Sequence, residues 1–428
     1  MLEILEEAST ATQQQNWSLV NQCLRQLPLE KNGAKSLPLE EADFEQALNF
    51  ALDVLEAGDF QERWDVAKVF PKLGERAIAP LIEILEDDEA DLEVRWFTAR
   101  ILGEFNHPTV ITSLVELLRT AEDEDLMEMA GAALSSFGKS AVNALADLLV
   151  DSQTRLLATQ SLSQIRRPEI IEPLLSVVND AEIAVRATAI EALSSFHDSR
   201  IPPILLDALN DRAAIVRKEA VIGLGLRSQV WDKLNVLDRI KPLLYDFNLD
   251  VCQQAAIALA RSRTDEAAEA LFKVLQSPAT PIPLKLELVR ALAWVGTANA
   301  LDYLQQALTC VSAEGVHEIV RVLGRLEHPI LKEKAAQILL NFFYSNDSVT
   351  KSVVIKQALA QAWGQLQEIK AIDALLEFLA DSEDSVRLHA IAALKNFPTA
   401  HQQLQQLASE ENLTPALREG IAIALAEW

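Results

Sequence analysis

Hydrophobic residues recur along most of this chain with the period of an α-helix. The residues Val185, Ala189, Leu193 and Phe196 are three or four positions apart, so they lie on one stripe of a helix. Small and large residues alternate on this stripe, and a neighbouring helix can therefore approach closely at the alanines. The pattern predicts a helix that is buried along one face against other helices.

The same pattern returns about every 31 residues, and we number each copy from its first core position, here called the anchor. The anchors are Asp65, Val94, Leu126, Thr154, Val185, Val216, Val251, Leu284, Gly315, Ile355, Val386 and Leu417. A leucine stands eight residues after almost every anchor, and a small residue usually follows that leucine. A repeat of this length is typical of helical solenoids, in which each unit contacts only its neighbours.

A second helix is expected in each unit after the anchored one. It opens with an alanine or with a proline, which suits the first turn of a helix: Pro80, Pro173, Pro203 and Pro242. Acidic residues three positions before an anchor are expected to cap the anchored helix: Asp91, Asp151, Glu182 and Glu383. The sequence therefore predicts an all-α protein, a right-handed α-solenoid of about twelve two-helix repeats.

The N-terminal part of the chain departs from this repeat. Residues 1–60 are expected to form a helical extension, with a polar, turn-forming linker at 28–38, and residues 61–428 to form the solenoid. The unit anchored at Val216 carries an extra loop around Arg227 to Asn235. Insertions in solenoids usually lie in loops on one face, where they are either tolerated surface variation or part of a binding site.

Composition and charge narrow the range of partners. The 428 residues carry a formal net charge of −25, which disfavours nucleic acids and anionic membrane surfaces and favours a protein partner. No apolar run reaches the roughly 18 residues of a membrane-spanning helix, and the acidic N-terminus does not resemble a signal peptide. The three cysteines lie far apart, as expected of reduced thiols in a cytoplasmic protein.

The repeat Glu182-Ile183-Ala184-Val185-Arg186, followed by Ala189 and Ala192-Leu193, resembles the HEAT-like repeat of the phycobilisome lyase family. The copy from Glu383 to Leu394 has the same glutamate, Val-Arg pair, alanine and Ala-Leu pair at the corresponding positions. This family includes E/F-type bilin lyases and the IscA-interacting HEAT-repeat protein, and the N-terminal segment resembles the latter. The resemblance implies a phycobiliprotein or an iron–sulfur assembly protein as partner. It leaves open a bilin lyase that would act on phycobiliproteins.

Candidates for metal chemistry are few. The cysteines lack the close spacing of a cluster site, so an iron–sulfur cluster would need a partner's ligands in addition to Cys252 and Cys310. A di-iron hydroxylase built on HEAT repeats would carry several His-Glu dipeptides, and only His317-Glu318 fits. We therefore expect no cofactor, with a bilin or an iron–sulfur cluster as the alternatives.

A docking surface is the remaining candidate. The residue three positions after the opening of each second helix should face away from the core. At these positions Glu83, Glu116 and Asp147 give an acidic stretch, whereas Leu206 and Tyr245 are apolar or aromatic, with Trp231 in the inserted loop nearby. An apolar centre with a charged rim is typical of a protein interface, although chance among solvated positions gives the same pattern.

Arginines directly after the anchor recur in many copies, as in Arg95, Arg155, Arg186, Arg217, Arg387 and Arg418. Their repetition favours a structural ladder of ion pairs between successive repeats over a specific ligand site. The function that the sequence predicts is a non-catalytic scaffold that binds a protein partner on a curved helical surface.

Overall fold

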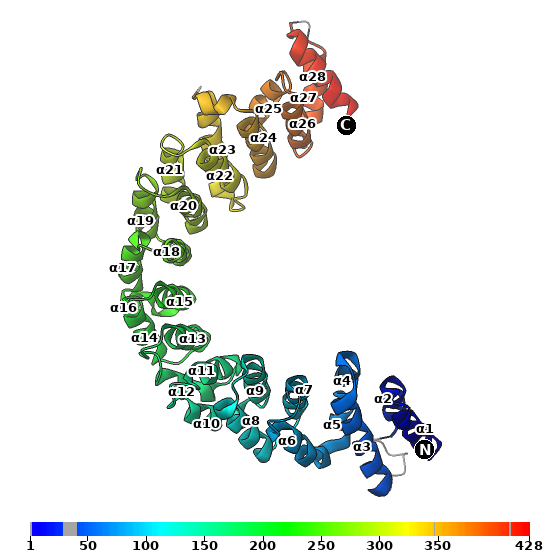
Figure 1. Ribbon diagram of the computed structural model, residues 1–428. Helices are drawn as coiled ribbons and strands as arrows, with labels where there is room; N and C mark the ends of the chain where they lie inside the picture. Colours follow the sequence, from blue (N-terminus) through cyan, green and yellow to red (C-terminus); the bar gives the residue numbers. More distant parts are fainter. Residues whose placement is uncertain (1, 29–40, 346, 411) are drawn as a thin grey trace. The chain divides into compact units, whose positions relative to one another are not determined.

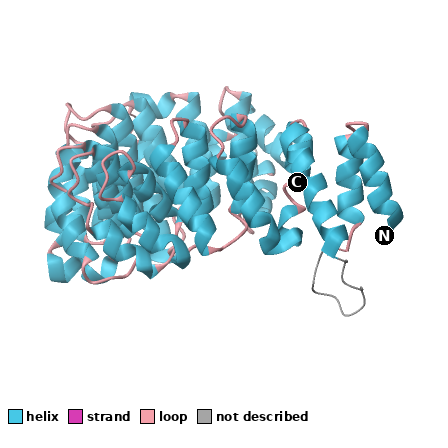
Figure 2. Cartoon of the chain, turned by 60° about the horizontal axis from the view of Figure 1, so that its bottom comes forward, coloured by secondary structure: helices cyan, strands magenta, loops and turns pink. Residues whose placement is uncertain are grey.

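The computed structural model describes residues 2–28, 41–345, 347–410 and 412–428. Within these ranges the chain is helical, with turns between the helices and no strand (Figures 1 and 2). The prediction of an all-α solenoid is confirmed. Apart from Pro28, the predicted linker at 28–38 lies outside the described residues, and the domain boundary at residue 60 stays a prediction. No helix in the described part of the chain is both long and apolar enough to cross a membrane.

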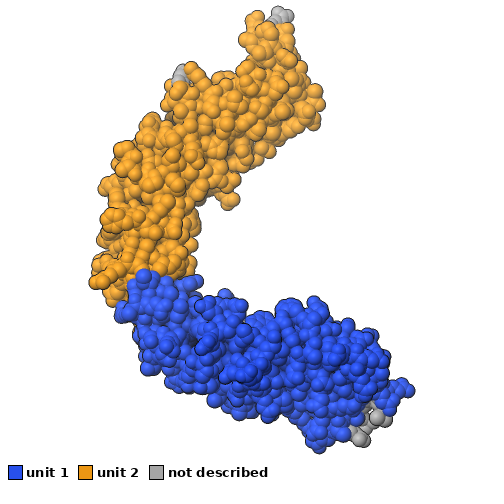
Figure 3. All heavy atoms as spheres, viewed as in Figure 1, with its two compact units in different colours: residues 1–197 blue, residues 198–428 orange. Residues whose placement is uncertain are grey.

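The chain forms two compact units, Met1–His197 and Asp198–Trp428 (Figure 3). Each unit has two layers of helices, and the helices that carry the anchors form one of them, here called the anchored layer. In unit 1 this layer comprises α4 (Phe60–Val66), α7 (Leu92–Leu102), α9 (Glu124–Ser136), α11 (Arg155–Gln164) and α13 (Ile183–Leu193). The second layer comprises α6 (Ile78–Glu86), α8 (Pro108–Thr120), α10 (Lys139–Leu148) and α12 (Ile171–Leu175). Before and between them lie α1 (Leu2–Gln13), α2 (Trp17–Gln26), α3 (Glu41–Ala57) and α5 (Phe70–Leu73).

Unit 2 repeats this arrangement. Its anchored layer comprises α15 (Ala214–Gly225), α18 (Leu249–Arg261), α20 (Ile282–Val295), α22 (Ala313–Gly324), α24 (Val353–Leu366), α26 (Asp384–Leu394) and α28 (Pro415–Ala426). Its second layer comprises α14 (Ile201–Ala208), α16 (Trp231–Leu234), α17 (Val236–Ile240), the 3₁₀ helix η4 (Lys241–Tyr245), α19 (Asp265–Leu275), α21 (Ala298–Ala307), α23 (Pro329–Tyr344), α25 (Ile372–Phe378) and α27 (Ala400–Ala408).

The hydrophobic stripe explains the core. Val185, Ala189 and Leu193 are fully buried, as the spacing predicts. The small residue that follows the leucine eight positions after the anchor lets neighbouring helices approach closely. At Gly324 in α22, an added Cβ would lie 2.7 Å from the Cβ of Ala362 in α24, which is closer than side-chain atoms can sit.

Arg155 and Arg217, directly after their anchors, join successive repeats as the structural interpretation predicts, whereas Arg95 and Arg387 pair with Asp88 and Asp384 of their own repeats. Arg155 donates to the Asp180 carboxylate over 2.8 Å, and Arg217 donates to both oxygens of Asp246 over 2.8 and 2.7 Å. Each of these aspartates belongs to the loop before the next anchored helix. These ion pairs form the ladder between repeats, and Lys356 makes the corresponding contact with Asp381 over 2.5 Å.

The capping prediction is correct for Asp91, whose carboxylate accepts from the N–H groups of Glu93 and Val94. It is wrong for Glu182 and Glu383, which occupy the N-cap position without a side-chain hydrogen bond. It is also wrong for Asp151, whose carboxylate accepts from Gln153 N–H, before α11 begins. Glutamate is one methylene longer than the residues that favour the N-cap. At each of these two glutamates, the carboxylate of the aspartate two residues earlier accepts from the glutamate N–H and holds the loop in place.

Candidate functional site

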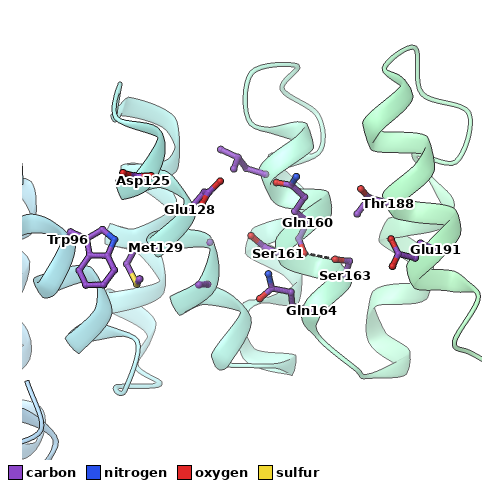
Figure 4. A pocket seen from close by; sticks show the side chains of 13 residues that line it. Trp96, Asp125, Glu128, Met129, Gln160, Ser161, Ser163, Gln164, Thr188 and Glu191 are labelled. Carbon is purple, nitrogen blue, oxygen red and sulfur yellow. Dashed lines mark hydrogen bonds between the residues drawn. The ribbon is translucent and has the colours of Figure 1, made fainter. Parts of the chain in front are cut away.

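A groove runs across four helices of the anchored layer in unit 1, namely α7, α9, α11 and α13 (Figure 4). Its volume is about 860 Å³, which is large enough for several residues of a peptide. These helices succeed one another in the solenoid, and the groove is lined by residues that lie off the hydrophobic stripe.

Apolar side chains lie toward one end of the groove. Trp96 from α7 and Met129 from α9 are half-buried there, and Figure 4 shows them next to each other. The Trp96 ring contacts Phe97 edge-on, with ring centroids 5.1 Å apart, and Phe97 is itself fully buried. This contact fixes the indole against the core while one side of it stays accessible.

The middle of the groove is polar and contains an unusual serine. Ser161 in α11 is only 4% exposed, and its hydroxyl has no hydrogen-bond partner among the described residues. Space for this hydroxyl comes from Gly131 in α9, where an added Cβ would lie 2.6 Å from Ser161 Oγ. The amides of Gln160 and Gln164, both exposed, lie on the same helix. These groups offer hydrogen-bond donors and acceptors to a ligand.

Three carboxylates line the groove and are exposed. Asp125 and Glu128 come from α9 and Glu191 from α13, and no lysine or arginine is among the lining residues. None of the three forms an ion pair within the described residues, in contrast to Asp180 and its partner Arg155. The site is therefore an anionic groove with an apolar end, and it is open to a cationic ligand.

The docking residues predicted on the second helices are divided between the two units. Glu83, Glu116 and Asp147 are exposed on α6, α8 and α10 of unit 1. In unit 2, Tyr245 is 67% exposed and Leu206 in α14 is half-buried. Tyr245 lines a smaller pocket of about 300 Å³ together with charged residues of η4 and α19. These placements agree with an outward orientation, and their role in docking stays a prediction.

Trp231 does not lie on that surface. It is 7% exposed, and its indole N–H donates to the Leu224 carbonyl over 3.0 Å. The inserted loop thus returns an aromatic side chain to the core of unit 2. This burial corrects the expectation of an exposed aromatic, because a partner has no access to the ring.

The two candidate cysteines differ in their surroundings. Cys252 is 4% exposed, and its thiol donates to the Asp246 carbonyl over 3.1 Å. Arg217 makes the corresponding bond to the Asp211 carbonyl, so Cys252 replaces an arginine in a structural position. Burial, together with the nearby Asp246 carboxylate, raises the pKa of the Cys252 thiol, which disfavours the thiolate that a metal requires. Cys310 is exposed.

A metal centre has little support from the donor groups. Within the described ranges, no three or more histidine, cysteine, aspartate or glutamate side chains are placed to hold an ion. In the single His-Glu dipeptide, Glu318 is buried and accepts from Arg290 over 2.6 Å and from Arg321 over 2.7 Å. Burial would raise the pKa of Glu318, but the hydrogen bonds from these two arginines lower it overall. Its carboxylate is thus neutralised by arginines and does not fit an iron site.

Sequence reasoning missed the groove because it searched the second helices for a binding surface. Most of the groove residues lie two, three, six, seven or ten positions after an anchor. At the position six after the anchor, Gln160 and Glu191 are polar, whereas Ile222 and Ile257 are apolar in the next copies. That change in polarity between copies was the available signal.

Comparisons with known proteins agree with this fold. A family model described as HEAT repeats matches residues 78–155 and 150–225. Deoxyhypusine hydroxylase of Rattus norvegicus is 26% identical over 305 residues, which cover 64% of this chain and 97% of the relative. The Homo sapiens enzyme is 25% identical over 282 residues, or 59% of this chain and 90% of the relative.

Among solved structures, an importin beta is similar in fold, with a TM-score of 0.52 and 14% identity over 97% of this chain and 63% of that one. At this identity the likeness concerns the fold alone. The resemblance to the phycobilisome lyase family is not shown by these matches and stays a prediction. What the comparisons establish is that the chain contains HEAT repeats and is similar to HEAT-repeat proteins of the deoxyhypusine hydroxylase kind.

Proposed function

We propose that this protein is a non-catalytic HEAT-repeat scaffold that binds a protein partner in the groove of unit 1. The observation that carries this proposal is the set of three unpaired carboxylates beside an apolar end. Elsewhere in the solenoid, loop aspartates such as Asp180 and Asp246 are matched by arginines. Carboxylates that the fold leaves unmatched along a groove are available to a partner.

Hydroxylase activity does not follow from the similarity to deoxyhypusine hydroxylase. An iron-dependent hydroxylase needs several imidazole and carboxylate ligands close together. This chain has one His-Glu dipeptide, and the carboxylate of Glu318 is held by Arg290 and Arg321. The donor set of the described residues therefore supports binding better than iron chemistry.

The repeat pattern also bears on the class of protein that the scaffold binds. The repeat resemblance favours a phycobiliprotein or an iron–sulfur assembly protein, encountered in the cytoplasm, and leaves bilin attachment and cluster transfer as alternatives. The visible absorbance of the purified protein separates these cases. A bound bilin absorbs strongly in the visible range and an iron–sulfur cluster gives a brown colour, whereas a scaffold of this kind has neither.

Affinity capture from the native cell extract tests the proposed face. The groove variant is Glu128→Lys with Glu191→Lys, and the matched control is Glu83→Lys with Asp147→Lys, which makes the same change of charge on the second layer of unit 1. All four carboxylates are exposed and lack an ion pair within the described residues. We expect the groove variant to lose the captured partner and the control to retain it.

If instead the control variant loses the partner and the groove variant retains it, the interface lies on the second helices. In that case Tyr245→Ala in unit 2 becomes the next variant, because Tyr245 is the most exposed of the apolar and aromatic residues in the predicted docking set. If both charge variants capture the same proteins as the unmodified chain, a protein-binding role for unit 1 is wrong. Circular dichroism of each variant must match the unmodified protein, so that lost capture is not a consequence of unfolding.

A further inference from the structure

We propose that the segment bound in the groove of unit 1 is an extended, basic peptide with two cationic side chains about five residues apart and an apolar side chain at one end. This inference rests on the proposed function and adds the chemistry of the occupant. It follows from four properties of the groove, namely its charge, the separation of its carboxylates, its polar middle and its apolar end.

The negative charge of the groove favours a cationic occupant. Asp125, Glu128 and Glu191 line the groove with no basic residue among them, and the whole chain carries a net charge of −25. A phosphate or nucleic-acid ligand would be repelled by both. Lysine or arginine side chains would gain charge-assisted hydrogen bonds with carboxylates that the fold does not use.

The separation of the carboxylates sets the spacing of the cations. Asp125 and Glu128 lie on α9, Glu191 lies on α13, and α11 is between them (Figure 4). Packed helices are about 8–10 Å apart, so the two acidic positions are separated by about 16–20 Å. An extended chain rises about 3.3 Å per residue, and this distance therefore corresponds to about five or six residues.

The polar middle favours an extended peptide over a helix. Ser161 is 4% exposed, its hydroxyl is accessible from the groove, and Gln160 and Gln164 present amides from the same helix. A helix satisfies its own backbone groups and would offer none of them to Ser161, Gln160 or Gln164. An extended segment exposes N–H and C=O groups, which can bond to these side chains as it crosses α11.

The apolar end of the groove sets the position of the apolar side chain relative to the two cations. Trp96 on α7 lies one helix beyond the Asp125 and Glu128 pair, away from Glu191, and Met129 on α9 lies next to the indole (Figure 4). One further helix spacing corresponds to about three residues of extended chain. A leucine-sized side chain about three residues outside the first cation would therefore contact the Trp96 indole and the flexible Met129 side chain.

Fluorescence anisotropy with synthetic peptides and the full-length protein tests this inference. The main probe is a labelled twelve-residue peptide of glycine and serine that carries two lysines five residues apart and a leucine three residues outside one lysine. The first control peptide has the same composition with adjacent lysines, and the second has glutamates in place of the lysines. The protein variants are Glu191→Gln, Ser161→Ala and the control Glu83→Gln.

We expect the spaced peptide to bind about fivefold more tightly than the adjacent one, because only the former reaches both acidic positions. The Glu191→Gln variant should remove this difference, Ser161→Ala should weaken binding of the spaced peptide, and Glu83→Gln should change nothing. Added salt should weaken binding, and the glutamate peptide should not bind. Equal affinities for the spaced and adjacent peptides, or a spacing preference that survives Glu191→Gln, would overturn the inference.

The capture experiment separates this inference from the proposed function. If the Glu128→Lys and Glu191→Lys variant loses its partner while no basic peptide binds, the occupant is of another kind and the scaffold proposal stands. If the groove variants affect neither capture nor peptide binding, both proposals fail.

Discussion

Replacing Asp246 by alanine should destabilise unit 2 by about 3 kcal/mol. The Asp246 carboxylate accepts from two nitrogens of Arg217 over 2.8 and 2.7 Å and from Asn248 N–H over 2.8 Å. The two charged side chains are only 15% and 7% exposed, so solvent screens this pair weakly. Removal of one partner of a buried ion pair typically costs about 3–5 kcal/mol. We expect the lower end because Arg217 keeps its bonds to the carbonyls of Asp211 and Arg212.

Hydrogen exchange and urea unfolding measure this loss. In a solenoid the effect of one lost contact stays close to it, so exchange should accelerate in α15 and α18 before more distant helices of unit 2. The matched control is Glu269→Ala, which removes the exposed pair with Lys273 in the same unit. Exposed pairs contribute less than about 1 kcal/mol, and the control should be nearly neutral.

The pH dependence gives an independent check on the same pair. Burial would raise the pKa of Asp246, but hydrogen bonds from Arg217 and Asn248 lower it overall. A lowered carboxyl pKa contributes stability above the ordinary value of about 3.9, and this contribution is lost as the pH falls through the lowered pKa. The difference in stability between the unmodified protein and Asp246→Ala should therefore shrink in that acidic range. A cost equal to that of Glu269→Ala at neutral pH, or a difference that grows on acidification, would refute the reasoning.

Three further predictions concern single positions. Leu193→Ala leaves a cavity at a fully buried site and should cost about 2–5 kcal/mol in urea unfolding, whereas Leu193→Met should cost clearly less. Trp231→Phe removes the hydrogen bond to the Leu224 carbonyl and should lower the free energy of unfolding by about 1 kcal/mol. Partner capture should not change. A loss of capture with intact stability would show that Trp231 belongs to the interface. Replacement of Cys252 and Cys310 by serine should leave iron content and visible absorbance after reconstitution unchanged, and a fall in either would establish the cysteines as cluster ligands.

The repeat was predictable because a single physical requirement generates it. Each anchored helix must bury the same stripe, and the positions that do so, such as Val185 and Leu193, cannot vary freely. The ladder was predictable for a related reason, since an arginine that recurs directly after the anchor must have a recurring environment. Both features repeat, and a repeated residue can be interpreted by comparison of its copies within one chain.

Features that occur once were not predictable in this way. The burial of Trp231 depends on how an irregular loop folds back, which no other copy of the repeat indicates. The groove combines Ser161 with Gly131 from the preceding repeat, and their contact depends on the distance between α9 and α11. Exposed positions of the anchored layer are free to vary in sequence, so their arrangement into a groove becomes visible only in three dimensions.

The ladder between repeats has a consequence for protein engineering. Each ion pair joins an arginine or lysine after one anchor to an aspartate before the next, as in Arg217 with Asp246 and Lys356 with Asp381. The repeat that begins at Asp246 accepts from Arg217 of the preceding repeat, but it carries Cys252 where a donor to the following repeat would stand. A second copy of that repeat inserted directly after the first would therefore leave the aspartate of the copy without a basic partner. A repeat chosen to lengthen the protein must carry both an aspartate before its anchor and a basic residue directly after it.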